Sequence, residues 1–138
     1  MTGESIQSKL DILRENLERM DQIPQRSFDE FASDFRNLDS AQHRLQTSIQ
    51  ALIDLGSHRI AHLGLTPPET SREILEILQT AGHLPEGSVE RFGPIFGFRN
   101  RIVHMYDKVD PKIVYEILLD SRRDLGDLLR ALLSIRSE

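Results

Sequence analysis

Apolar residues recur along most of the chain with the spacing of amphipathic helices. In the first segment they fall three or four positions apart, at Ile6, Leu10, Leu13, Leu17 and Met20. This spacing predicts a helix of about five turns with one apolar face. Ser5 precedes the apolar positions as a candidate N-cap, and Pro24 follows them as a stop signal.

A second helical segment begins at the capping-box pattern Ser27-Phe28-Asp29-Glu30, which predicts a helix starting at Phe28. Its apolar pattern continues to Leu63, with a candidate break over residues 37–40. The Pro67-Pro68 pair that follows predicts the end of this segment. The pattern is therefore typical of one long helix, or of two helices joined by a short turn.

Two further helices have clear end signals. Thr66 or Thr70 is expected to cap a short helix that Gly82 closes, since glycine readily adopts the left-handed backbone found after a helix. Asp110-Pro111 combines an N-cap residue with a first-turn proline and predicts the start of a last helix that reaches Ile135.

Between these two, Pro85 is expected in the first turn of a helix that runs to about Tyr106, and Pro94 is expected to start or kink its second part. No segment shows sustained alternation of apolar and polar residues, so no sheet is predicted. Long helices with short connections favour an all-α fold, an up-and-down helical bundle of four to five main helices. With 138 residues, we expect a single domain over residues 1–138.

Composition restricts the classes of function. The chain has no Cys, which excludes disulfides, thiolate zinc sites and a cysteine nucleophile. It has no long apolar run and no basic-then-apolar N-terminus, so we expect a cytoplasmic protein without a membrane segment. The net charge of -5 disfavours general binding of nucleic acid. Between Val89 and Lys108, however, four basic residues outnumber two acidic ones, which is compatible with RNA.

The residues with the most chemical potential lie between Gly97 and Tyr106. At about 100° per residue, Arg99 falls in the middle of an apolar stripe, where a cation is costly without a partner or an opening. Asn100 and His104 are four residues apart and are neighbours on the flank of that stripe. Arg99 and His104 point about 140° apart. One substrate touches both only from a groove between helices or between subunits.

Two interpretations of this segment are open on spacing alone. In the first, Arg99 pairs with a carboxylate from another helix, while His104 and Tyr106 simply finish the helix. In the second, an arginine that can hold a phosphate and a histidine that can move a proton serve phosphodiester chemistry without a metal or other cofactor.

The segment resembles the signature of the HEPN superfamily, and more closely that of HepT-like toxins: an arginine, four residues, a histidine, one residue and a tyrosine. Asn100, directly after Arg99, matches the usual family residue, and the helical order agrees over most of the chain. Met105 stands where many relatives have an acidic residue.

The resemblance implies a homodimer whose paired motifs form a cleft, and a metal-independent endoribonuclease toxin of a type VII-like toxin–antitoxin pair. It implies that Arg99 binds the scissile phosphate, that His104 acts as general acid or base, and that Asn100 supports the site. It also implies that a cognate nucleotidyltransferase antitoxin adenylylates Tyr106. The alternative is a non-catalytic helical companion or substrate-binding subunit of a nucleotidyltransferase.

Other polar residues give weaker signals. His58 and His62 lie four apart, but no third ligand is evident, so we expect a solvated or interfacial pair and no metal site. Gly93 and Gly97 have a spacing that favours close helix packing. Isolated histidines and clustered acidic residues are expected at the surface; they are His43, His83, Asp29, Glu30, Asp34 and Asp39.

Overall fold

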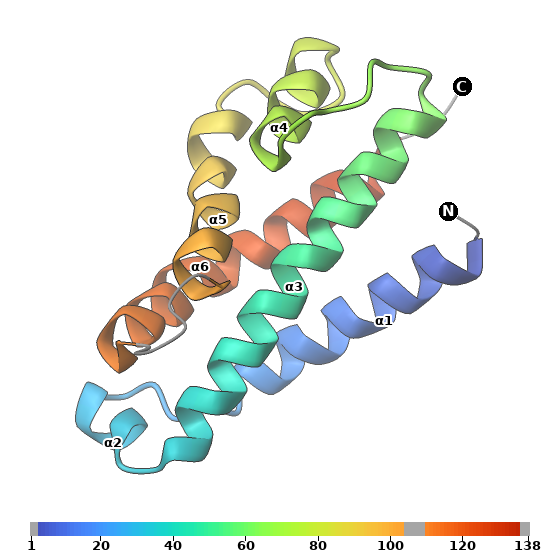
Figure 1. The fold of residues 1–138 in the computed structure, drawn as a ribbon. Helices are drawn as coiled ribbons and strands as arrows, with labels where there is room; N and C mark the ends of the chain where they lie inside the picture. The colour runs from blue at the N-terminus through green and yellow to red at the C-terminus, as the bar shows by residue number, and fades with distance from the viewer. Residues whose placement is uncertain (1–2, 104–109, 136–138) are drawn as a thin grey trace.

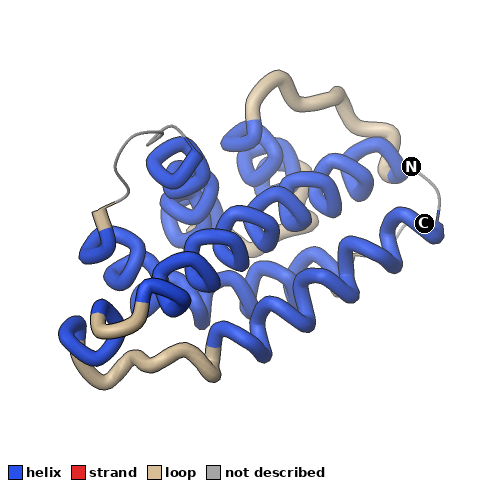
Figure 2. The backbone as a smooth tube through the Cα atoms, turned by 60° about the horizontal axis from the view of Figure 1, so that its bottom comes forward, coloured by secondary structure: helices blue, strands red, loops and turns tan. Residues whose placement is uncertain are grey.

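The computed structural model describes the backbone of residues 3–103 and 110–135, and the side chains of residues 6–99 and 110–135. This part of the chain forms six helices (Figure 1): α1 Gly3–Met20, α2 Phe28–Ala32, α3 Phe35–His62, α4 Ser71–Thr80, α5 Ser88–Val103 and α6 Pro111–Leu133. Every element in this described part is a helix or a loop, as Figure 2 shows. The prediction of an all-α bundle is confirmed, with five longer helices and the five-residue α2.

The longest helix, α3, is the centre of the bundle and packs against each of the other five helices. It approaches α4 closely at Gly56. A Cβ built at Gly56 would lie 2.6 Å from Ile74 Cγ2, so only glycine allows the observed separation of the two backbones. The core is made from apolar faces of all six helices, with fully buried side chains that include Leu13, Phe31, Leu45, Leu52, Leu75 and Ile95.

A buried polar group fixes α1 against α3. The Asn16 side chain is 4% exposed and donates hydrogen bonds to Thr47 Oγ1 (2.7 Å) and Ser48 Oγ (3.0 Å). Its Oδ1 accepts a bond from Arg44 Nη1 at 3.0 Å. Because an unsatisfied buried amide costs about 1–3 kcal/mol, sliding α1 along α3 is disfavoured.

Several predicted helix ends are confirmed. Ser27 caps α2 by accepting from the Glu30 backbone N–H at 3.1 Å. Thr70, rather than Thr66, caps α4 in a complete capping box with Glu73. Asp110 caps α6 and accepts from the Lys112 N–H at 2.9 Å. Gly82 follows α4 with a φ of 83°.

Other predicted ends are wrong. Ser5 lies inside α1, which already includes Gly3. The break in the second segment comes before residues 37–40, because the Asp34 carboxylate caps the Arg36 N–H and starts α3 at Phe35.

Pro85 lies before α5, not in its first turn. Gly87, with a φ of 89°, separates the proline from the helix that starts at Ser88, because a left-handed residue cannot continue an α-helix. Pro94 does not start a new helix, since α5 runs through it with the ring on the exposed side. The predicted end of this helix, near Tyr106, lies outside the described residues.

Candidate functional site

Residues 97–103 of the motif segment form the C-terminal part of α5, a helix that packs against α3, α4 and α6. Ile95 and Phe96 are buried and attach this part of the helix to the core. Arg99 follows Ile95 by four residues, on the same side of the helix, and its side chain is half-buried. The predicted position of Arg99 on the apolar stripe is therefore confirmed.

Arg99 differs from most of the half-buried arginines of this bundle. Among the described side chains, none forms an ion pair or a hydrogen bond with Arg99. The interpretation in which a carboxylate from another helix neutralises Arg99 has no support within residues 6–99 and 110–135. Its guanidinium has no acceptor among the described side chains, and a guanidinium can hold a phosphate through two parallel hydrogen bonds.

The other motif residues are only partly placed. Asn100 belongs to the backbone of α5, but its side chain is outside the described set. His104 and Tyr106 lie outside the described residues. The arrangement of these three side chains around Arg99 and a substrate therefore stays a prediction.

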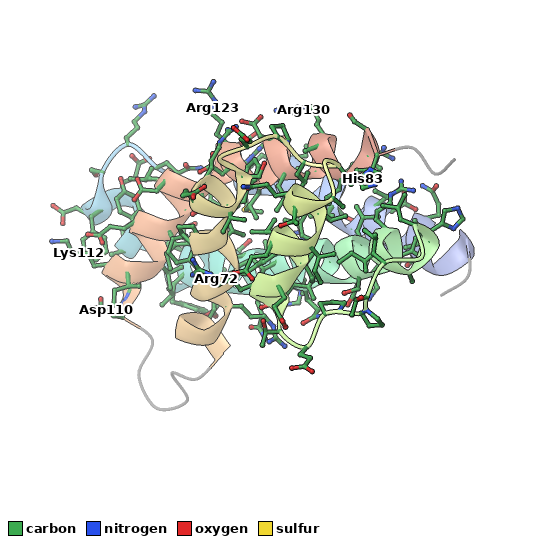
Figure 3. The ribbon with its side chains drawn as sticks, turned by 90° about the horizontal axis from the view of Figure 1, so that it is seen from above. Arg72, His83, Asp110, Lys112, Arg123 and Arg130 are labelled. Atoms are coloured by element: carbon green, nitrogen blue, oxygen red, sulfur yellow. The ribbon has the colours of Figure 1, made fainter. Side chains whose placement is uncertain are left out.

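A second arginine, Arg91, attaches the first half of α5 to α6. Its Nε and Nη2 donate to Asp124 Oδ1 at 3.1 and 3.0 Å, and Nη2 also bonds to Asp127. Asp127 also accepts a bond from Arg130 on its own helix. The Arg91 guanidinium lies 4.8 Å from the ring centroid of Phe92. Figure 3 shows Arg123 and Arg130 along this edge of α6.

These contacts stabilise the charged forms of both partners. Hydrogen bonds from Arg91 lower the pKa of the Asp127 carboxyl, with a smaller contribution from Arg130. Bonds to Asp127 and Asp124 raise the pKa of Arg91. The sequence analysis missed this cluster, although Asp124 and Asp127, three apart on one helix face, were the available signal.

His58 and His62 lie side by side on α3 as stacked rings, 6.0 Å between centroids. Burial lowers the pKa of His58, and the positive charges of Arg59 and His62 lower it further. Within the described part of the chain, no three His, Asp or Glu side chains are placed to hold a metal ion together. His43 is exposed and His83 is half-buried, away from the start of α6 (Figure 3).

The glycine spacing on α5 does not bring a described helix into close contact. A Cβ built at Gly93 or Gly97 would have nothing within 4 Å among the described residues, so the expected close packing is not found there. Gly97 and Pro94 are exposed, whereas Gly93 is buried. At Gly97 the helix therefore presents bare backbone to its surroundings.

The acidic residues behave as expected of a surface. Asp29, Glu30 and Asp39 are exposed, while Asp34 caps α3 and pairs with Arg36 at 2.8 Å.

None of the described helices is both long and apolar enough to cross a bilayer.

Comparison with solved structures supports the fold. A tri-AMPylated HEPN toxin of Shewanella oneidensis, in complex with an MNT antitoxin, superposes with a TM-score of 0.80 over 97% of this chain and 99% of the toxin chain, at 22% identity. A toxin–antitoxin complex with AMP-PNP gives a TM-score of 0.78 over 96% of this chain and 99% of the other, also at 22% identity. Likeness at this identity establishes a shared fold.

Sequence comparison gives the family. The tRNA nuclease HepT of Aphanizomenon flos-aquae is 28% identical over 110 residues, which are 80% of this chain and 75% of that protein. The family model described as ribonuclease HepT-like matches residues 13–132, a range that contains the whole motif from Arg99 to Tyr106. The chain belongs to the HepT-like ribonuclease family.

Proposed function

We propose that this protein is a metal-independent endoribonuclease and the toxin of a type VII-like toxin–antitoxin pair, acting on RNA in the cytoplasm. The family match across residues 13–132, together with the half-buried Arg99 that meets no described carboxylate, carries the proposal. A helical scaffold without catalysis has no physical need for Arg99, Asn100, His104 and Tyr106 together.

Each motif residue has a role that its chemistry allows. Arg99 would bind the scissile phosphate and stabilise the charge that develops on it. His104 would take the proton of the ribose 2′-hydroxyl or give one to the leaving oxygen, since histidine titrates near neutral pH. Asn100 would orient these groups by hydrogen bonding.

The exposed Gly97 on α5 supports a homodimer. At about 100° per residue, positions 97 and 104 of a helix differ by about 20°. A second copy can approach α5 closely at Gly97, where an added Cβ would meet nothing within 4 Å, and His104 would then enter the interface. Arg99 points about 140° away from His104, so a site that uses both is more easily built from two subunits.

Tyr106 is the proposed site of control. The Shewanella oneidensis relative is tri-AMPylated and bound to an MNT antitoxin. A cognate nucleotidyltransferase would join the Tyr106 phenol oxygen to the α-phosphate of ATP, with loss of the phenol proton and release of pyrophosphate. The AMP left on Tyr106 would place a phosphate near Arg99, where it competes with RNA for the guanidinium. The attached nucleotide would also fill the cleft.

Cleavage of RNA in EDTA by purified wild-type and His104→Ala proteins tests the activity. We expect the wild type to stay active and the cleavage rate of the variant to fall by about 100-fold or more, because a positioned acid–base group contributes about that much. Wild-type cleavage by His104→Ala, or loss of wild-type cleavage in EDTA, would contradict the proposal.

Tyr106→Phe tests the control step, because it removes only the acceptor oxygen. We expect this variant to fold, to cleave RNA and to stay unmodified and toxic when co-expressed with the partner. A mass increase by AMP units on Tyr106→Phe, with toxicity neutralised, would place the modification at another residue.

A further inference from the structure

Helix α2, which leads into α3, packs against the start of α6. We define the α2–α3 corner as residues 28–39. The rings of Phe28 and Phe31 lie 5.7 and 5.2 Å from the ring of Tyr115 on α6, centroid to centroid. The Tyr115 hydroxyl donates a hydrogen bond to the carbonyl of Gln25 at 2.9 Å. This corner is therefore fixed to the first turns of the helix that follows the motif.

Phe35 projects from this corner into solvent. It is the first residue of α3 and is 73% exposed, well above Leu119 and Ile12, the other exposed large apolar side chains in the described chain. The backbone on both sides is fixed. Asp34 caps the Arg36 N–H, and the Asn37 side chain donates to the Phe31 carbonyl at 3.1 Å. A ring presented on a rigid backbone loses little conformational entropy when a partner covers it.

The exposed charges of the corner are mainly acidic. Asp29, Glu30 and Asp39 are exposed, and the one basic residue of the corner, Arg36, is paired with Asp34 at 2.8 Å. Such a surface repels the phosphates of RNA and attracts a cationic protein surface. The exposed aromatic side chain with an acidic rim thus fits a protein partner.

The corner lies within reach of the modified tyrosine. Tyr106 is four residues before Asp110, so its Cα is at most about 14 Å from the Cα of Asp110 in any conformation. Tyr115, which the corner covers, is one and a half helical turns beyond Asp110. Figures 1 and 2 both show α2 beside the first turns of α6. A standard protein interface covers about 800 Å² per partner, a patch roughly 16 Å in radius.

We propose that the α2–α3 corner is the docking site for the nucleotidyltransferase that modifies Tyr106, with Phe35 as its aromatic anchor. This inference rests on the proposed function. An enzyme that transfers AMP from ATP must hold a triphosphate with cationic groups, arginine, lysine or Mg²⁺, at the mouth of its site. The acidic rim of the corner would pair with other arginine and lysine side chains on the partner's surface beside that site, and Phe35 would fill an apolar pocket next to them.

The test compares Phe35→Ala with Ile12→Ala, a matched control that removes an exposed apolar side chain from α1. Binding of each purified protein to the purified cognate nucleotidyltransferase is measured by titration calorimetry, and AMP transfer by intact mass. We expect Phe35→Ala to weaken binding about 30-fold and to slow AMP transfer, the loss typical of an interface hot spot. Ile12→Ala should match the wild type, and Phe35→Tyr should keep most of the affinity.

Charge is tested in a second arm. Neutralising the rim with Asp29→Asn, Glu30→Gln and Asp39→Asn together should slow association and make its rate less dependent on salt. RNA cleavage without the partner should be unchanged in every variant, because the corner holds none of the motif residues.

Three results would overturn the inference: wild-type partner affinity for Phe35→Ala, a weaker RNA affinity in Phe35→Ala that identifies a base-stacking platform, or loss of the homodimer in Phe35→Ala without the partner. If wild-type protein neither cleaves RNA nor accepts AMP, the proposed function itself fails. Wild-type protein that does both, with Phe35→Ala indistinguishable from it, refutes only the docking site.

Discussion

Two arginines on the same helix, Arg91 and Arg99, have opposite surroundings. Arg91 is bonded to Asp124 and Asp127 and lies over the Phe92 ring. Arg99, two turns further along α5, is half-buried and meets no acceptor among the described side chains. A guanidinium that is already neutralised holds a fold together, whereas one without a described counter-ion keeps its donors for a ligand.

The difference follows from what each part of α5 faces. The first half lies against α6 where Asp124 and Asp127 stand one turn apart, so a cation there gains two acceptors. The second half presents Ile95 and Phe96 to the core, and the described helices place no carboxylate opposite the following turn. Residue type alone would assign both arginines the same role.

The largest expected effect comes from Arg99→Ala. We expect RNA cleavage to fall about 100-fold or more, because an anion-stabilising group contributes about 3–4 kcal/mol to a transition state. Helical content by circular dichroism and the melting temperature should stay close to the wild type. Arg91→Ala is the matched control and should keep most of the activity of the folded protein. Equal losses of activity in both variants would contradict the comparison.

Gly56→Ala should reduce stability without reducing the activity of the folded protein. The added methyl group would lie 2.6 Å from Ile74 Cγ2 and force α4 away from α3. Overpacking of this kind costs about 1–3 kcal/mol in free energy of unfolding, measurable by urea denaturation. Since Gly56 and Ile74 lie on α3 and α4, which carry none of the motif residues, the variant separates stability from catalysis.

Gly126→Ala is the control for this effect. Its new methyl group would meet only the ends of flexible arginine side chains, the nearest being Arg122 Nη1 at 3.4 Å. The better helix propensity of alanine should leave stability unchanged or slightly raised. Equal destabilisation by both substitutions would show that the α3–α4 approach is not the cause.

Arg91→Ala should lower the melting temperature modestly, because it removes the bonds between α5 and α6. Arg123→Ala is the control, since Arg123 is 90% exposed and its Nε lies 3.9 Å from Asp127. We expect Arg123→Ala to change the melting temperature less, as exposed and distant ion pairs contribute little. A larger fall in melting temperature for Arg123→Ala than for Arg91→Ala would contradict the assignment of the α5–α6 contact to Arg91.

The smallest expected effect is the pH dependence of the fall in melting temperature caused by Arg91→Ala. Arg91 lowers the pKa of Asp127 in the folded state below its unfolded value of about 3.9. The Arg91–Asp127 pair therefore makes its full contribution to the free energy of unfolding above about pH 4. That contribution is lost as the pH falls through the pKa of Asp127 in the folded state. The difference in melting temperature between wild type and Arg91→Ala should narrow in acid, as calorimetry can measure. A difference that widens in acid would contradict this assignment.

Much of the fold follows from local signals in the sequence. Thr70, Asp110 and Gly82 act at helix ends through their own side chains or backbone, so their roles were predictable without tertiary structure. The prediction for Pro85 failed because a neighbouring residue, Gly87, takes a left-handed conformation that delays the helix. The prediction of a break over residues 37–40 also failed, because the Asp34 cap starts α3 at Phe35.

The features of the candidate site also divide into those that follow from the sequence and those that depend on the tertiary structure. The sequence alone determined the motif, its helix and the position of Arg99 on an apolar stripe, since these depend on residue type and on the period of a helix. Only the tertiary structure decided that Arg91 is clamped by α6, that Arg99 has no carboxylate opposite it among the described residues, and that Gly56 must be small. Each of these depends on which atoms other helices bring within a few ångströms, and pairing between distant segments leaves no periodic trace in the chain.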